Sequence, residues 1–108
     1  MISSHILDTT LGKPAANVEL RLFNAENTLI ATAFTNDDGR VLVPDFGLTH
    51  IEVGDYSIEF GVKEYFSKLN TETFFPKVII HFSISDSAQH YHIPLLISPF
   101  AYSTYRGS

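Results

Sequence analysis

Hydrophobic and polar residues alternate with a period of two along much of the chain. The alternation is clearest where Val18, Leu20 and Leu22 are separated by Glu19 and Arg21. Because side chains two apart on a strand point to the same face, this pattern predicts a half-buried strand.

Similar patterns follow, and turn-forming residues separate most of them. Strands are expected at Thr28–Phe34, Arg40–Val43, Tyr56–Phe60, Val78–Ile84, His90–Ile97 and Phe100–Tyr105. Only one stretch has helical spacing: Val62, Tyr65, Phe66 and Leu69 recur at intervals of three and four, which predicts a short helix over Val62–Leu69. About seven or eight short strands separated by turns predict an all-β sandwich or barrel.

Length and composition indicate one domain, expected to span residues 1–108. Of the 108 residues, 44% are hydrophobic and 18% are charged, and none is Cys, so disulfides and thiolate chemistry are excluded. Seven Lys and Arg against twelve Asp and Glu argue against a nucleic-acid partner. No stretch is apolar enough for a membrane span, and the first residues lack the pattern of a secretory signal, so a cytoplasmic location is expected.

The C-terminal segment from Tyr91 to Tyr105 is hydrophobic on both faces. The core of a two-sheet sandwich covers only one face of each sheet. The other face therefore needs a partner, and a second copy of the same subunit is the simplest one. The alternative is that all these residues belong to an ordinary core. They are Tyr91, Ile93, Leu95 and Ile97 on one face, and Leu96, Phe100 and Tyr102 elsewhere.

Histidine is the residue most suited to proton transfer near neutral pH. His90 and His92 are two apart in a strand pattern, so both imidazoles should share one face, with Tyr91 on the other. The pair is compatible with a zinc site completed by His5, with acid–base catalysis, or with two ordinary solvated or hydrogen-bonded residues. Pro94 cannot donate to a sheet, which predicts an edge, a bulge or an interruption in this strand.

Arg40 follows the turn Asn36-Asp37-Asp38-Gly39 and opens the next strand or closes that turn. Its planar guanidinium could hold an anionic or carbonyl-rich ligand. The alternative is a surface Arg after a hairpin turn. The sequence contains no Gly-rich phosphate loop, no G-x-S-x-G elbow and no H-E-x-x-H motif.

Four stretches of the chain stand out as motifs. They are the opening Ser4-His5-Ile6-Leu7-Asp8, the central Asp38-Gly39-Arg40, Phe74-Phe75-Pro76-Lys77-Val78, and the C-terminal His90-Tyr91-His92-Ile93-Pro94-Leu95-Leu96, which continues to Tyr105-Arg106-Gly107-Ser108. Together they resemble the 5-hydroxyisourate hydrolases, the transthyretin-related proteins of purine catabolism. The terminal tetrapeptide is that family's signature, and transthyretins proper lack it. The resemblance covers the whole chain without a large insertion.

The resemblance implies a transthyretin-like (prealbumin) sandwich of two four-stranded sheets with one short helix. It also implies a homotetramer, a dimer of dimers, with sites in the channel between dimers. The implied reaction is the hydrolysis of 5-hydroxyisourate to 2-oxo-4-hydroxy-4-carboxy-5-ureidoimidazoline in urate degradation, without a cofactor or a metal.

The family's functional positions fall on four residues of this chain: His5, Arg40, His92 and Ser108. Tyr105 and Arg106 are expected to help bind the substrate, and Gly107 to shape the site. Three rival interpretations remain: a transthyretin-type carrier of a small ligand without catalysis, a zinc-dependent hydrolase that uses His5, His90 and His92, and an Ig-like interaction domain without a pocket.

The side chains suggest a mechanism. Neutral His92, coupled to His5, would take a proton from the attacking water, and Arg40 would offset charge on the attacked carbonyl. Ser108 could act through its hydroxyl or through the terminal carboxylate. Which His is the base stays open, because two coupled groups titrate as a unit.

Overall fold

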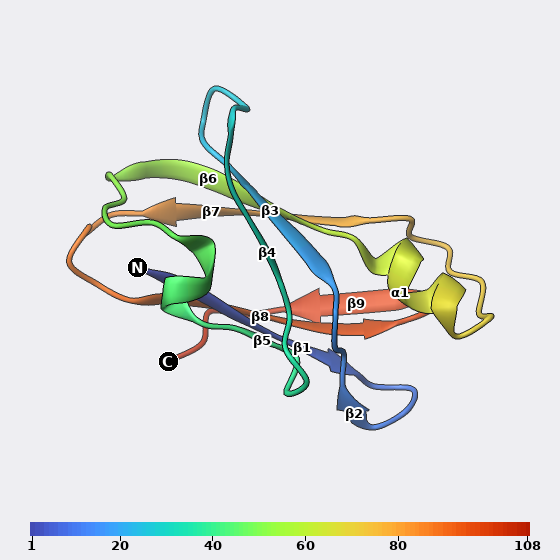
Figure 1. Cartoon of the computed structure of the whole chain (residues 1–108). Helices are drawn as coiled ribbons and strands as arrows, with labels where there is room; N and C mark the ends of the chain where they lie inside the picture. Colours follow the sequence, from blue (N-terminus) through green and yellow to red (C-terminus); the bar gives the residue numbers. More distant parts are fainter.

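The computed structural model describes residues 1–108 and contains two β-sheets packed face to face (Figure 1). The first sheet has the order β4-β3-β6-β7. The second has the order β2-β1-β8-β9, and a two-residue strand, β5, also pairs with β1. The expected all-β, transthyretin-like sandwich with one short α-helix is confirmed, and β5 adds a fifth short strand to one sheet.

The elements have the following bounds. The first sheet contains β3 (Glu19–Phe23), β4 (Leu29–Phe34), β6 (Gly54–Phe60) and β7 (Val78–Ile84). The second contains β1 (Ile2–Asp8), β2 (Lys13–Pro14), β5 (Arg40–Val41), β8 (Tyr91–Ser98) and β9 (Ala101–Thr104). The helices are a 3₁₀ turn, η1 (Val43–Phe46), and α1 (Val62–Lys68).

The strand expected over Arg40–Val43 is shorter than predicted. It ends at Val41, and the chain turns into η1 instead. Pro44 lies in the first turn of η1, where its fixed φ favours a helix and its missing N–H costs nothing. The Asp45 carboxylate accepts a hydrogen bond of 2.8 Å from the Leu42 N–H, which closes this turn.

β1 runs parallel to β8, whereas all other strand pairs are antiparallel. In the order of this sheet β8 lies between β1 and β9, so it is an inner strand and not an edge. The edge, bulge or interruption expected at Pro94 is wrong for the strand itself, because β8 continues through Pro94, which pairs with His5 of β1. Only the pairing with β9 stops short of Pro94, since it begins at Leu95, opposite Thr104. The Thr104 hydroxyl donates a hydrogen bond of 2.6 Å to the Pro94 carbonyl at this point.

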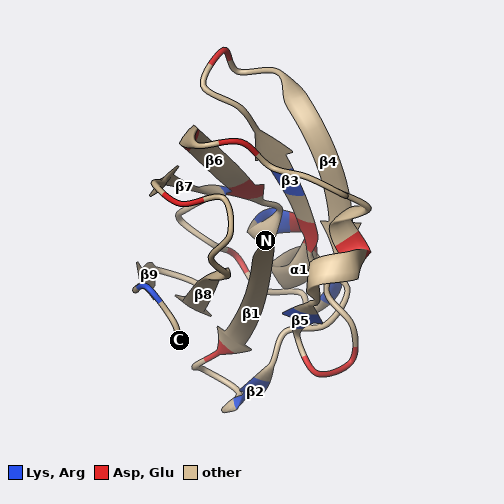
Figure 2. Ribbon diagram, turned by 90° about the vertical axis from the view of Figure 1, so that its left-hand side faces the viewer, with Lys and Arg blue, Asp and Glu red and all other residues tan.

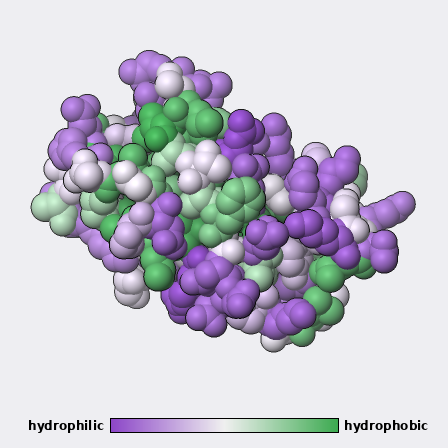
Figure 3. Space-filling model, in the orientation of Figure 1, coloured by the Kyte–Doolittle hydropathy of each residue, from purple (hydrophilic) through white to green (hydrophobic).

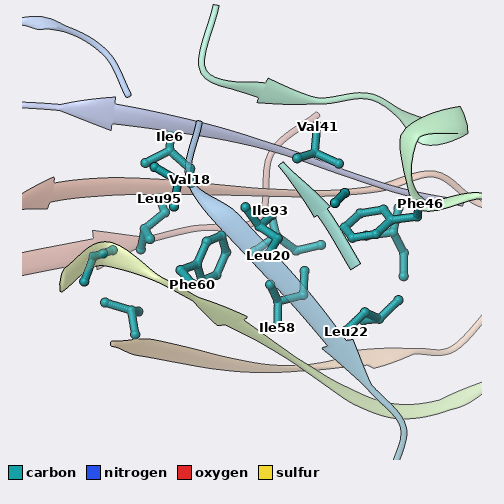
Figure 4. Packing of buried hydrophobic residues seen from close by; sticks show 14 of the residues in the cluster. Ile6, Val18, Leu20, Leu22, Val41, Phe46, Ile58, Phe60, Ile93 and Leu95 are labelled. Atoms are coloured by element: carbon teal, nitrogen blue, oxygen red, sulfur yellow. The ribbon is translucent and has the colours of Figure 1, made fainter. Parts of the chain in front are cut away.

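The hydrophobic core lies between the two sheets (Figure 4). Each inner face contributes every second residue of its strands, as the period of two predicts. The predicted helix contributes Val62 and Phe66, whereas Leu69 lies beyond its end and is 42% exposed. The fully buried side chains of this core include Ile6, Val18, Leu20, Leu22, Val41, Ile58, Phe60 and Leu95.

The C-terminal segment does not fit wholly into this core. Its inner residues are buried, but Phe100 is 71% exposed and Tyr102 is 42% exposed. An ordinary core therefore does not account for both faces of the segment.

The surface is mostly hydrophilic at the end that carries α1, while hydrophobic side chains gather nearer the middle of the same face (Figure 3). Lys and Arg are scattered along the ribbon, with Asp and Glu among them (Figure 2). None of the helices is long and apolar enough to cross a membrane.

Candidate active site

The outer face of the second sheet, turned away from the core, carries the polar residues of β1 and β8. Along β1, Ile2, Ser4 and Ile6 are buried on the inner face, so Ser3 and His5 point outward. The same alternation on β8 turns His92 outward, since Tyr91 and Ile93 lie in the core. Ser3 pairs with His92 in the register of these two strands.

Arg40 reaches the same face through β5. It pairs with His5 across β1 and β5, and directly opposite residues of two paired strands point to the same side of the sheet. Gly39, which precedes Arg40, has a φ of +72°, and a Cβ there would stand 2.5 Å from the Ile6 carbonyl oxygen. Only glycine allows the turn to approach β1 this closely, so Gly39 brings Arg40 to His5.

Ser3 joins the two histidines of the H-Y-H segment. Its hydroxyl lies 2.7 Å from His90 Nε2 and 2.8 Å from His92 Nδ1, and its side chain is almost completely buried. The expectation that His90 and His92 share one face is confirmed, although His90 itself lies just before β8.

The C-terminus folds back onto this face. The Gly107 N–H donates a hydrogen bond of 2.9 Å to the His92 carbonyl, and Ser108 follows as the last residue. Figure 1 shows the chain end returning from β9 to the end of the sheet where β1 begins. A hollow of about 220 Å³ results, and its lining includes Ser3, Arg40, His90, His92 and Ser108.

Burial and nearby positive charge favour the neutral form of both central imidazoles. Desolvation is the main reason why the pKa of His92 lies below its ordinary value, and Arg40, His90 and His5 add to this effect. The pKa of His5 is lowered by desolvation first and by Arg40 second, while a hydrogen bond to the Asp38 backbone acts in the opposite direction. Two neutral imidazoles beside a fixed guanidinium can accept a proton and stabilise a developing anion.

Tyr105 and Arg106 lie outside this hollow. Both line a neighbouring hollow of about 280 Å³ next to Tyr91, on the β7 side. The Arg106 guanidinium lies 4.8 Å from the centre of the Tyr91 ring and donates a hydrogen bond of 3.0 Å to the Gln89 side chain. His92 lines both hollows. Within one chain, Arg40, His92 and Ser108 therefore share one hollow, with His5 paired to Arg40 beside it, whereas Tyr105 and Arg106 lie in the other hollow with His92.

The chain has no group of three or more His, Asp or Glu side chains arranged to hold a metal ion. The zinc interpretation that combined His90 and His92 with His5 therefore has no geometric support.

The sequence interpretation missed Ser3. No strand was expected before residue 18, so the alternation that places Ser3 beside His5 and opposite His92 was not used. The available signal was its spacing: Ser3 stands two residues before His5, and side chains two apart on a strand share a face.

The sequence is similar to those of known proteins that belong to one family. A sequence profile of the HIUase/Transthyretin family matches residues 2–107. A probable 5-hydroxyisourate hydrolase of Caenorhabditis elegans is 43% identical over 99% of this chain and 81% of its own length. The 5-hydroxyisourate hydrolase of Salmonella typhimurium is 42% identical over the full chain and 81% of its own length.

Two solved structures with related sequences have the same fold as this chain. The 5-hydroxyisourate hydrolase of Klebsiella pneumoniae superposes with a TM-score of 0.89 at 36% identity and covers 99% of this chain and 98% of its own. Sea bream transthyretin in complex with thyroxine superposes equally well, with a TM-score of 0.89, at 29% identity over 98% of this chain and 93% of its own.

Fold and site together define a transthyretin-like β-sandwich with a His-Arg-His cluster on the outer face of one sheet. The transthyretin and hydrolase branches share the sandwich. The chain belongs to the HIUase/Transthyretin family.

Proposed function

We propose that this protein hydrolyses 5-hydroxyisourate to 2-oxo-4-hydroxy-4-carboxy-5-ureidoimidazoline in urate degradation. The observation that carries the proposal is the convergence of His5, Arg40 and His92 on one sheet face, with Ser108 lining the same hollow as Arg40 and His92. These four residues come from three strands, β1, β5 and β8, and from the chain end. Relatives about 40% identical over the full chain are named for this activity.

The reaction begins with water attacking the ring carbonyl next to nitrogen. As the oxygen–carbon bond forms, neutral His92, coupled to His5, takes the proton of the water. The carbon–nitrogen bond of the six-membered ring then breaks, and the departing nitrogen receives that proton back from the imidazolium. The lowered pKa of both histidines supports this role, because it keeps them unprotonated at neutral pH.

Arg40 holds the ring oxygens and offsets the negative charge that grows on the attacked carbonyl. Its charge is fixed, so it stabilises the anion without a proton transfer. Ser108 completes the binding surface through its hydroxyl or its terminal carboxylate. The proposal requires no cofactor and no metal.

We propose a homotetramer, a dimer of dimers, as the active form. The hollow is open on the outer sheet face of one chain, and exposed aromatic residues such as Phe100 and Tyr102 continue along the same segment. Assembly would cover this face and shield the site from bulk solvent, leaving room for the substrate and the attacking water. Tyr105, which is 61% exposed, and Arg106 would join the binding surface at this stage.

The carrier interpretation is the second candidate, since the transthyretin neighbour is described with thyroxine. The polar, ionisable character of this hollow favours catalysis over storage of an apolar ligand. Freshly prepared 5-hydroxyisourate, followed by its absorbance with and without protein, separates the two. Faster decay that survives a chelator supports the proposal, whereas the uncatalysed rate would contradict it. A molecular mass measured on the same sample tests the tetramer.

The remaining parts of the proposal concern organisation and location. The family match extends over residues 2–107, which supports one functional domain across the chain. A cytoplasmic location stays a prediction that cell fractionation can test.

A further inference from the structure

We infer that Ser3 and His90 act together as positioning residues that hold neutral His92 in the tautomer with hydrogen on Nδ1 and a free lone pair on Nε2. The inference deepens the proposed function, because it names the residues that prepare His92 as a base. It begins with one buried hydroxyl between two imidazole nitrogens, 2.7 Å from His90 Nε2 and 2.8 Å from His92 Nδ1.

A serine hydroxyl has a single hydrogen, so it can donate to only one of the two nitrogens and must accept from the other. In one arrangement, Ser3 donates to His92 Nδ1, and His92 then carries its hydrogen on Nε2. In the other, His92 Nδ1–H donates to Ser3, and Ser3 donates to His90 Nε2. Only the second arrangement leaves His92 Nε2 able to accept a proton from water.

The charge around His92 favours the second arrangement. Arg40 lines the same hollow as His92, and a guanidinium has donors but no lone pair to offer. Positive charge beside the ring favours a free lone pair over an N–H on the nitrogen that is not bonded to Ser3. Other polar groups around His92 are His5 on β1, His90 before β8 and Ser108. The neighbouring hollow that His92 also lines adds His81, Tyr91, Tyr105 and Arg106.

His90 determines which way the hydrogen bonds of Ser3 run. When its Nε2 accepts the hydrogen of Ser3, the serine oxygen is left to accept from His92 Nδ1–H. During turnover His92 Nε2 takes up the proton of the water and returns it to the departing nitrogen, while the hydrogen on Nδ1 stays bonded to Ser3. Ser3 and His90 therefore change no bond themselves and act only through His92.

The direct test is the ¹⁵N spectrum of the histidine side chains in the assembled, substrate-free protein, at a pH where His92 is neutral. We expect the Nδ1–H form for His92 in the wild type and a shift toward the Nε2–H form in Ser3→Ala and His90→Ala. An Nε2–H form in the wild type would overturn the inference. Because no substrate is present, this result does not depend on the proposed reaction.

Kinetics supply the second test. Removing a group that orients a catalytic side chain typically costs about 10-fold to 100-fold, so kcat should fall by this factor in Ser3→Ala while KM changes little. Ser57→Ala is the matched control, since Ser57 is similarly buried but lies on β6 in the other sheet, outside the hollow. Equal kcat values for the two variants would contradict the role of Ser3.

His90→Gln tests the direction of the bonds. A glutamine oxygen can accept the Ser3 hydrogen as His90 Nε2 does, so this variant should retain more of kcat than His90→Ala. Equal losses in both variants would contradict the role of His90. If no variant or wild-type sample turns over 5-hydroxyisourate, the proposed function fails, whereas the spectrum still decides the tautomer.

Discussion

Gly107 lies against the imidazole ring of His92. A Cβ built on Gly107 would stand 2.5 Å from His92 Cδ2 and 3.2 Å from Cγ, and the Gly107 N–H donates to the His92 carbonyl. The backbone of the terminal tetrapeptide thus forms one wall around the ring. Glycine is needed at this position because it has no side chain. The backbone of Gly107 is not in the left-handed conformation, so conformational freedom is not the reason.

Gly107→Ala should therefore impair catalysis while leaving the fold intact. The added methyl group must displace either the ring or the chain end, and a misplacement of about 1 Å at a catalytic group can cost up to about 10²-fold in rate. Gly61→Ala is the matched control, because its new Cβ would meet nothing closer than 3.4 Å. Equal activity of both variants would show that the tetrapeptide does not position His92.

Arg40→Lys should lower kcat/KM, because the lysine ammonium lacks the planar pair of donors. Loss of one preorganised donor at a developing oxyanion costs about 3 kcal/mol, and steady-state kinetics would show the loss. Arg21→Lys is the control: Arg21 lies on β3 in the other sheet, in an exposed ion pair of 3.5 Å with Glu59. An unchanged kcat/KM in Arg40→Lys would exclude Arg40 from charge stabilisation.

The pH profile of kcat/KM should have an acidic limb with an apparent pKa below 6.5. A free histidine suggests a value near 6.5, but burial and Arg40 lower the pKa of His5 and His92 from there. Since a lowered pKa keeps the base unprotonated at lower pH, activity should persist below pH 6.5 and then fall as the histidines become protonated. A profile without an acidic limb would contradict a histidine base.

Tyr65→Phe should destabilise the fold without touching the site. The Tyr65 hydroxyl donates a hydrogen bond of 2.7 Å to the carboxylate of buried Asp8, and this bond with burial raises the pKa of Tyr65 well above its usual range. An unsatisfied buried acceptor costs about 1–3 kcal/mol, which urea unfolding would reveal. Tyr102→Phe serves as the control, since its ring is partly exposed. Equal unfolding midpoints would refute the role of this bond.

Most of the sandwich could be predicted because most of the seven expected strands, and the helix, show their buried face as regular spacing, although β9 is exposed at all four positions. β1 was missed for a physical reason: Ser3, Ser4 and His5 are all polar, although Ser4 is buried and satisfied by the Ile93 carbonyl. The alternation of burial is real on this strand, but its residue types conceal it.

The residues of the site could be predicted from motifs that resemble a known family. Their arrangement in space could not, because it depends on contacts between residues far apart in the sequence. Parallel pairing of β1 with β8 joins residues almost ninety positions apart, which no local pattern reveals. The role of Ser3 depends on this pairing, and Gly107 meets His92 only because the chain end folds back onto β8. For the same reason, the sequence could not separate Tyr105 and Arg106 from the hollow that contains Ser108.

The most direct test of the account is the decay of 5-hydroxyisourate catalysed by His92→Asn, measured beside the wild type and His50→Asn at equal protein concentration. Loss of a general base typically costs about 10²–10⁴-fold, so His92→Asn should lose nearly all turnover. The molecular mass of its assembly in solution should match that of the wild-type assembly. His50→Asn should match the wild type. Near-normal turnover by His92→Asn would contradict the proposed mechanism.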